Sequence, residues 1–103
     1  MTELCSIHDI QESNSKGFDS PHGAIFVVKK DDQIFVYKNE CPHLGVNLEF
    51  QEDVFLDQDG ALIECSTHGA LFEIESGNCL AGPCQGEHLT AIPFKIENDL
   101  IHV

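Results

Sequence analysis

Two short runs of this chain each place a cysteine and a histidine within three residues of one another. The first run is Cys41-Pro42-His43-Leu44-Gly45, and the second is Cys65-Ser66-Thr67-His68-Gly69. We expect both runs to be loops, because a glycine follows each pair and favours backbone conformations found in tight turns. Two loops that carry four potential ligands predict a single metal site.

The types of these ligands limit which metals could bind but do not identify a single one. Thiolates and imidazoles together suit zinc, iron–sulfur clusters and copper. Most zinc modules pair Cys with Cys and His with His, whereas each run here carries one of each, as C-x-H and C-x-x-H. The order of the ligands therefore favours an iron–sulfur cluster, and a zinc-stabilised interaction module is the less favoured alternative.

This arrangement resembles the Rieske family. The similarity continues through Gly69-Ala70-Leu71-Phe72-Glu73, Ser76-Gly77 and Gly82-Pro83, in the order seen in Rieske ferredoxins. It covers roughly the whole chain and is most specific from Cys41 to Pro83. The spacer from Leu44 to Glu64 looks a few residues longer than in the short dioxygenase-type ferredoxins, and the extra length falls in the acidic stretch 49–59.

The resemblance implies one Rieske-type 2Fe-2S cluster and assigns its ligands. Cys41 and Cys65 are expected to bind one iron, and His43 and His68 the other. Backbone amides near the ligands are expected to donate hydrogen bonds to the cluster sulfurs, and a Gly-Pro segment is expected to cover the cluster. The surrounding positions implied in this way are Leu44, Gly45, Gly69, Ala70 and Pro83.

The resemblance to the Rieske family also predicts where the reduction potential of this chain lies within the Rieske range. High-potential members have an extra Cys in each loop, which form a disulfide, and Ser and Tyr hydroxyls that donate towards the cluster sulfurs. This chain has Val46 and Thr67 at the disulfide positions, and Ala70 and Phe72 where the hydroxyls would be. Fewer donors stabilise the reduced state less, which predicts a potential near the low end, about -150 mV.

The net charge of the chain restricts the classes of partner that it could bind. The chain of 103 residues carries eighteen acidic side chains, five lysines and no arginine, which gives a formal net charge of -13. Nucleic acid and anionic membranes are therefore excluded as partners, and a protein with a basic docking surface fits better. No apolar stretch approaches transmembrane length and the first residues do not resemble a secretory signal, so we expect a cytoplasmic protein.

The remaining cysteines and histidines have simpler interpretations. Cys79 and Cys84 are expected to be buried thiols, with the alternative that Cys84 lies near the cluster or pairs with Cys79. Cys5 is expected to be a small apolar residue of an edge strand. Histidines without a partner at ligand spacing are expected at the surface or in satisfied positions: His8, His22, His88 and His102.

Alternating and β-rich runs separated by Gly, Asn and Asp predict an all-β sandwich or partly open barrel. The predicted strands are Leu4–Ile10, Ala24–Lys29, Gln33–Lys38, Ala61–Glu64, Leu71–Ile74, His88–Glu97 and Leu100–Val103. Lys30-Asp31-Asp32 and Glu97-Asn98-Asp99 are predicted hairpin turns. The family resemblance implies one Rieske domain, residues 1–103, in which a cluster-binding subdomain of about residues 40–82 is inserted into a β base.

These expectations together describe a one-electron carrier that is not itself an enzyme. A soluble Rieske-type ferredoxin would pass electrons from a flavin-containing reductase to a terminal oxygenase or related oxidoreductase, and we expect it to be a monomer. The alternative is a tightly bound small redox subunit, like that of assimilatory nitrite reductase. A stable stoichiometric complex would distinguish this subunit from a dissociable carrier.

Overall fold

The computed structural model of the chain describes residues 2–40, 55–57, 59–65, 69–82 and 86–103. In these residues it has β strands and one short 3-10 helix, so the predicted all-β class is confirmed. The elements are β1 (Glu3–Ser6), η1 (Ile7–Asp9), β2 (Asn14–Ser20), β3 (Gly23–Lys30), β4 (Gln33–Lys38), β5 (Leu62–Cys65), β6 (Ala70–Glu73), β7 (Cys79–Ala81), β8 (Lys95–Glu97) and β9 (Leu100–His102). Within the described part, no helix has the length and apolar character needed to span a membrane.

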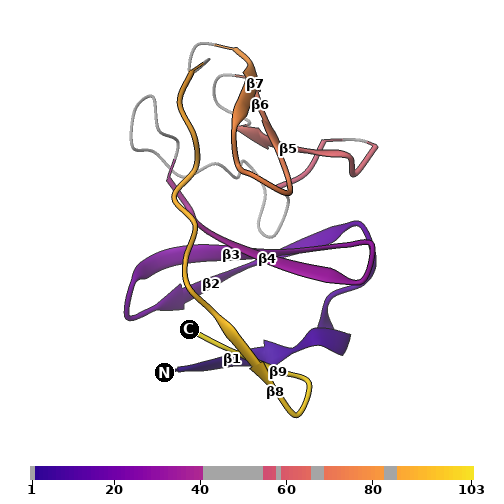
Figure 1. The fold of residues 1–103 in the computed structure, drawn as a ribbon, viewed down its shortest axis with the longest axis vertical. Coiled ribbons are helices and arrows are strands. Elements are labelled where there is room, and N and C mark those ends of the chain that lie inside the picture. Colours follow the sequence, from indigo (N-terminus) through magenta and orange to yellow (C-terminus); the bar gives the residue numbers. More distant parts are fainter. Residues whose placement is uncertain (1, 41–54, 58, 66–68, 83–85) are drawn as a thin grey trace.

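The strands form three antiparallel sheets of three strands each, arranged along the long axis of the molecule (Figure 1). The terminal sheet has the order β1-β9-β8, the middle sheet β2-β3-β4 and the third sheet β5-β6-β7. Figure 1 shows the terminal sheet at one end, the third sheet at the other and the middle sheet between them. The third sheet therefore lies far from both chain termini.

Both ends of the chain build the terminal sheet. The backbones of Thr2 and Val103 exchange two hydrogen bonds, of 2.6 and 2.8 Å, beside the β1–β9 pairing. Asn98 and Asp99 join β8 to β9 with φ angles of 51° and 64°, which confirms the hairpin predicted there. Asn and Asp tolerate this left-handed conformation better than most residues.

The central strand of the middle sheet, β3, is apolar and buried on both faces along its middle part. Ile25, Phe26, Val27 and Val28 are all fully buried. Side chains alternate along a strand, so Ile25 and Val27 join the core shared with the terminal sheet, whereas Phe26 and Val28 join the core shared with the third sheet. The described residues thus form two hydrophobic layers, one on each side of β3.

Several predicted strands differ from the observed ones. The strand predicted over Leu4–Ile10 ends at Ser6, whose hydroxyl accepts a hydrogen bond from His8 N and caps η1. The strand predicted over His88–Glu97 is regular only in β8; nearer its start, His88 and Ala91 form isolated bridges. This stretch leaves one sheet and joins another, so it cannot continue one ladder.

Two strands were not predicted at all. β2 has the polar sequence NSKGFDS, with Phe18 as its one large apolar side chain, and it forms because it pairs with β3 along its whole length. β7 is only three residues long and is paired irregularly with β6. Local sequence patterns carry little signal for strands whose stability comes from a neighbouring strand.

Candidate metal centre

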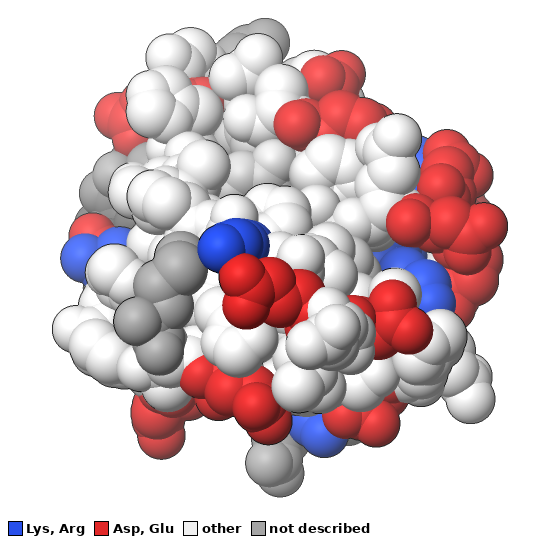
Figure 2. All heavy atoms as spheres, turned by 60° about the horizontal axis from the view of Figure 1, so that its bottom comes forward, with Lys and Arg blue, Asp and Glu red and all other residues white. Residues whose placement is uncertain are grey.

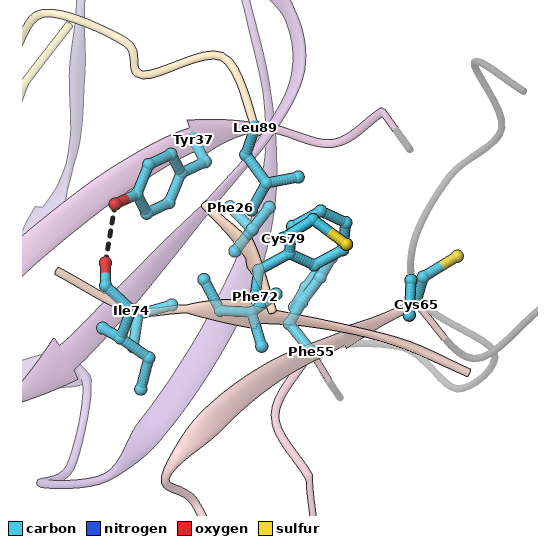
Figure 3. Close-up of a cluster of buried hydrophobic side chains, with 11 residues drawn as sticks. Phe26, Tyr37, Phe55, Cys65, Phe72, Ile74, Cys79 and Leu89 are labelled. Carbon is cyan, nitrogen blue, oxygen red and sulfur yellow. Dashed lines mark hydrogen bonds between the residues drawn. The ribbon is translucent and has the colours of Figure 1, made fainter. Parts of the chain in front are cut away.

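Cys65 is the predicted ligand that the structure describes. It is the last residue of β5, it is fully buried, and it lies opposite Ala70 at the start of β6. The backbone N–H of Gly69 donates to the carbonyl of Cys65 at 2.8 Å, so the residue before β6 is bonded to the last residue of β5. Figure 3 shows the Cys65 sulfur directed away from the phenyl rings of Phe55 and Phe72.

A third segment of chain reaches the same end of the sheet. Gly82 follows β7 with a φ of +100°, and a Cβ built on it would lie 2.7 Å from the Cα of Ala70. Only a residue without a side chain allows this approach. Cys65, the Gly69-Ala70 pair and Gly82 therefore lie together at one end of the third sheet, where β5 and β7 end and β6 begins.

The other predicted ligands and several of the surrounding residues lie outside the described residues. These are Cys41, His43, Leu44, Gly45, His68 and Pro83. Two of them are sequence neighbours of described residues, because His68 precedes Gly69 and Pro83 follows Gly82. The described residues contain no group of three or more His, Cys, Asp or Glu side chains placed to hold a metal.

The residues at this end of the third sheet fit an iron–sulfur cluster. A buried thiol is the ligand that such clusters require, and Cys65 supplies one at the end of a strand. Ala70 and Gly82 are small, so three backbone segments approach one another beside that thiol. The amide of Gly69, expected to donate to a cluster sulfur, donates in this structure to the carbonyl of Cys65.

The two positions that bear hydroxyls in high-potential relatives are apolar and buried. Ala70 and Phe72 both have no exposed surface, and Phe72 packs in the core between the third and middle sheets. Neither side chain carries a hydrogen-bond donor. The environment on this side of the sheet is therefore a low-polarity one.

The described cysteines outside the site are largely screened from water. Cys79 is buried in β7, and its thiol donates to the carbonyl of Ala81 at 3.2 Å. Cys5 is half-buried in β1, an edge strand as predicted. Burial raises the pKa of the Cys5 thiol and the nearby Asp9 carboxylate adds to the effect, which disfavours the thiolate form. Cys84 lies outside the described residues.

The remaining histidines lie at or near the surface. His8 Nε2 lies 3.2 Å from Asp99 Oδ2, and both side chains are exposed. Nδ1 of His88 lies 2.9 Å from the carbonyl of Leu89. His22 is exposed and His102 is half-buried at the end of β9. None of them belongs to a metal-binding group among the described residues.

The third sheet rests on the middle sheet through an aromatic layer. The rings of Phe26 and Phe55 stack with centroids 4.4 Å apart, and the rings of Phe26 and Tyr37 are 5.9 Å apart. The backbone N–H of Phe55 also donates to Ser15 Oγ at 3.2 Å. This aromatic layer holds the third sheet in place, and Cys65 lies at the end of that sheet away from the aromatic rings (Figure 3).

Tyr37 supplies the polar contact across this layer. Its buried hydroxyl donates to the carbonyl of Ile74 at 2.6 Å, just beyond the end of β6 (Figure 3). Burial raises the pKa of Tyr37 to about 12, with further contributions from Glu75 and Glu73. A Cβ on Gly77 would lie 2.9 Å from the Tyr37 ring, so the glycine makes room for it. Sequence reasoning missed this contact.

The segment 87–92 connects the third sheet to the middle sheet by backbone hydrogen bonds. On one side, Cys79 N donates to Glu87 O and Leu89 N donates to Gly77 O, both at 2.9 Å. On the other side, Lys38 N donates to Thr90 O at 2.8 Å and Ile92 N to Val36 O at 3.0 Å. The candidate site is therefore held on a sheet that is connected firmly to the rest of the fold.

Comparison with known proteins agrees with this picture. The model of the Rieske [2Fe-2S] domain family matches residues 1–95. The chain is 32% identical over 102 residues to the ferredoxin component of the p-cumate 2,3-dioxygenase system of Pseudomonas putida. The match covers 97% of this chain and 81% of the relative.

Solved structures show the same fold. A ferredoxin of Sphingomonas yanoikuyae B1 superimposes with a TM-score of 0.76 at 29% identity, covering 96% of this chain and 92% of that one. The complex of reduced oxygenase and oxidised ferredoxin in carbazole 1,9a-dioxygenase matches with a TM-score of 0.78 at 21% identity, covering 97% of both chains. The second likeness is one of fold alone.

Proposed function

Because this chain belongs to the Rieske [2Fe-2S] domain family, we propose that it is a one-electron carrier that delivers electrons to an oxygenase. The observation that carries the proposal is the family match over residues 1–95, together with 32% identity to a ferredoxin component of a dioxygenase system. A bound 2Fe-2S cluster supplies reversible one-electron chemistry. The protein itself holds this group, shields it from water and presents it to partners.

Four side chains are proposed as the ligands. Cys41 and Cys65 hold one iron and His43 and His68 the other, the pattern of Cys₂ and His₂ ligation that defines Rieske centres. The buried position of Cys65 at the end of β5 supports this assignment. The residues proposed to surround the cluster are Leu44, Gly45, Gly69, Ala70 and Pro83.

The potential is proposed to lie near the low end of the Rieske range, about -150 mV. Two thiolates and two neutral imidazoles leave the oxidised cluster with less negative charge than an all-Cys cluster, which makes reduction easier. Ala70 and Phe72 are buried and have no hydroxyl to stabilise the added electron. The environment therefore favours the lower part of the range.

The partners are proposed from the roles of the relatives. The p-cumate relative is a ferredoxin component, and the carbazole structure pairs a ferredoxin with its oxygenase. We assign this chain the same place, between a flavin-containing reductase and a terminal oxygenase, as a monomeric, cytoplasmic and non-catalytic component. Residues 40–82 are proposed as the cluster-binding subdomain, because β5, β6 and β7 form a sheet of their own.

Reconstituted turnover tests this function. We expect p-cumate oxidation by the purified reductase and oxygenase of the p-cumate 2,3-dioxygenase system to depend on the added chain and to saturate with its concentration. Each molecule should serve many turnovers, because a carrier dissociates after each transfer. A permanent one-to-one complex with an oxidoreductase, or no turnover from a chain that dithionite reduces normally, would contradict a dissociable carrier.

A further inference from the structure

Charge is distributed very unevenly along the chain. Residues 40–94 contain ten of the eighteen acidic side chains and none of the five lysines, which are at positions 16, 29, 30, 38 and 95. This segment includes all of the third sheet, whereas the terminal and middle sheets carry both signs of charge. The third sheet therefore lies in a field of one sign.

Neighbouring lysines neutralise only the margin of this segment. Lys30 approaches Glu75 at 3.4 Å and Lys38 approaches Glu40 at 3.2 Å, both from the middle sheet. Among the described residues, no lysine is paired with Asp57, Asp59, Glu64 or Glu73. In contrast, Figure 2 shows blue lysines interspersed with red carboxylates on the face towards the terminal sheet.

The outer face of the third sheet combines these acids with aliphatic side chains. Ile63, Cys65, Ala70 and Phe72 are buried towards the middle sheet, so the alternate residues of β5 and β6 face outwards. The outer face consists of Leu62, Glu64, Leu71 and Glu73 with Ala81 of β7 paired to Leu71, and Leu80 lies at the irregular step of β7 next to this pair. Leu80 is 48% exposed, the most exposed large apolar side chain among the described residues.

A shallow hollow of about 400 Å³ lies beside this face. It is lined by Asp57, Asp59, Glu64 and Leu71. One carboxylate oxygen of Asp57 accepts hydrogen bonds from the backbone N–H groups of Ala61 and Leu62, at 3.0 and 3.3 Å, which fixes its direction. Leu71 can contact the alkyl stem of an entering lysine or arginine while the carboxylates face its charged end.

This surface is adjacent to the candidate metal centre. Glu64 precedes Cys65 in β5, and its strand partner Leu71 follows Ala70 in β6. A partner seated on the outer face would therefore contact the strands that carry the Cys65 ligand. Electron transfer requires such proximity, whereas binding on the terminal sheet would place a partner at the opposite end of the molecule (Figure 1).

We propose that the outer face of the third sheet is the docking surface for an electron-transfer partner that presents lysine or arginine side chains around an aliphatic centre. The inference rests on the proposed carrier function and specifies which surface performs it. Opposite charge brings the partner in rapidly, and the small apolar contact at Leu71 and Leu80 orients it without preventing release. A basic protein is the occupant because the residues that line the hollow are acidic and aliphatic, and Lys30 reaches only its margin, where it donates to the carbonyl of Ala61 at 3.5 Å.

The test measures how fast the dithionite-reduced holoprotein reduces cytochrome c, a lysine-rich electron acceptor, at 20 and 200 mM NaCl. The face variant is Asp59→Asn with Glu64→Gln. The control is Glu3→Gln with Asp19→Asn, which removes the same charge from exposed positions in β1 and β2. Leu80→Ala is matched with Ile96→Ala, whose parent side chain is 42% exposed in β8.

We expect the face variant to lose about three- to tenfold in the second-order rate at low salt and most of its salt dependence. Both controls should stay within about twofold of the wild type, and Leu80→Ala should slow the reaction more than Ile96→Ala. Equal losses in face and control variants, or no loss in either, overturn the docking assignment while the carrier function stands. A wild-type protein that accepts electrons from dithionite but does not pass them on overturns both.

Discussion

Cys65 and Tyr37 show how single residues connect the candidate site to the fold. Both belong to the buried layer between the middle and third sheets, Cys65 at its edge and Tyr37 within it (Figure 3). Cys65 offers a thiol where three backbone segments meet, and Tyr37 ties the end of β6 to β4 through a 2.6 Å hydrogen bond. One residue is assigned to the cofactor and the other holds the supporting sheet in position.

Replacing Cys65 with Ser should abolish the cluster. The hydroxyl of serine is a poor substitute for a thiolate on iron, so we expect the bound iron to fall from about two ions per chain towards zero. Cys5→Ser is the matched control, because Cys5 is half-buried in the terminal sheet and should leave iron content unchanged. Full iron content in the Cys65→Ser protein would remove Cys65 from the ligand set.

Replacing Tyr37 with Phe should destabilise the protein by about 1–3 kcal/mol, because it leaves the carbonyl of Ile74 buried without its donor. The free energy of unfolding in urea measures this loss.

The raised pKa of Tyr37 also gives a dependence on pH. Tyr37 has a pKa of about 12 in the folded protein against about 10 for an ordinary tyrosine, so its contribution to stability is complete below pH 10 and is lost as pH rises towards 12. The chain has one Tyr and no Trp, so phenolate absorbance of the cluster-free protein reports this residue alone. A Tyr37 titration near pH 10 in folded protein would show that the hydroxyl is not buried as described.

At the scale of strands and turns, the close approach between β6 and the end of β7 is what brings the three segments of the site together. Gly82 lies against the backbone of Ala70, and Gly77 leaves space for the ring of Tyr37. The carbonyl and amide groups of 87–92 then join the third sheet to the middle one. The architecture of the site therefore depends on a few positions that permit close contact.

Gly82→Ala should weaken retention of the cluster. The new Cβ would lie 2.7 Å from Ala70 Cα, a backbone atom that cannot rotate away, so the segment must move from its place beside Cys65. Gly86→Ala is the control: it has a similar φ of +94°, but nothing lies within 4 Å of its Cβ. We expect the half-time of iron release to a chelator to shorten several-fold in Gly82→Ala alone. Equal shortening in both would attribute the effect to backbone strain.

The contrast between elements shows what the sequence can predict here. The strongly apolar β3 and β4, and the Asp and Asn turns that follow β3 and β8, are evident from local patterns. The polar β2 depends on pairing with β3, and the interrupted path of 88–97 depends on two sheets at once. The ligand spacing predicts the kind of site, but the Tyr37–Ile74 contact spans 37 residues and requires the tertiary structure.

The whole molecule combines a supporting part of mixed charge with a distal sheet of negative charge. The core between the terminal and middle sheets gives these two sheets apolar contacts that do not involve the candidate site. The third sheet has one buried face and shares its core with Phe26 and Val28. Stability is therefore expected to differ along the long axis of the molecule.

Removing the cluster should loosen the third sheet selectively. Metal binding contributes folding free energy to the segments that hold the ligands. Native-state hydrogen exchange should show the amides of β5, β6 and β7 losing protection by about tenfold or more in the cluster-free protein, while β3 and β4 keep theirs. Uniform loss across all three sheets would instead indicate one cooperative unit.

The most direct test of the account is the spectrum of the protein itself. We would express the chain anaerobically, record its visible spectrum and measure the EPR spectrum after reduction with dithionite. A Rieske centre predicts a red-brown protein and a rhombic signal with an average g below the free-electron value, absent from the His43→Ala and His68→Ala variants but retained in His22→Ala. A colourless protein that contains one zinc ion per chain would contradict the electron-carrier function.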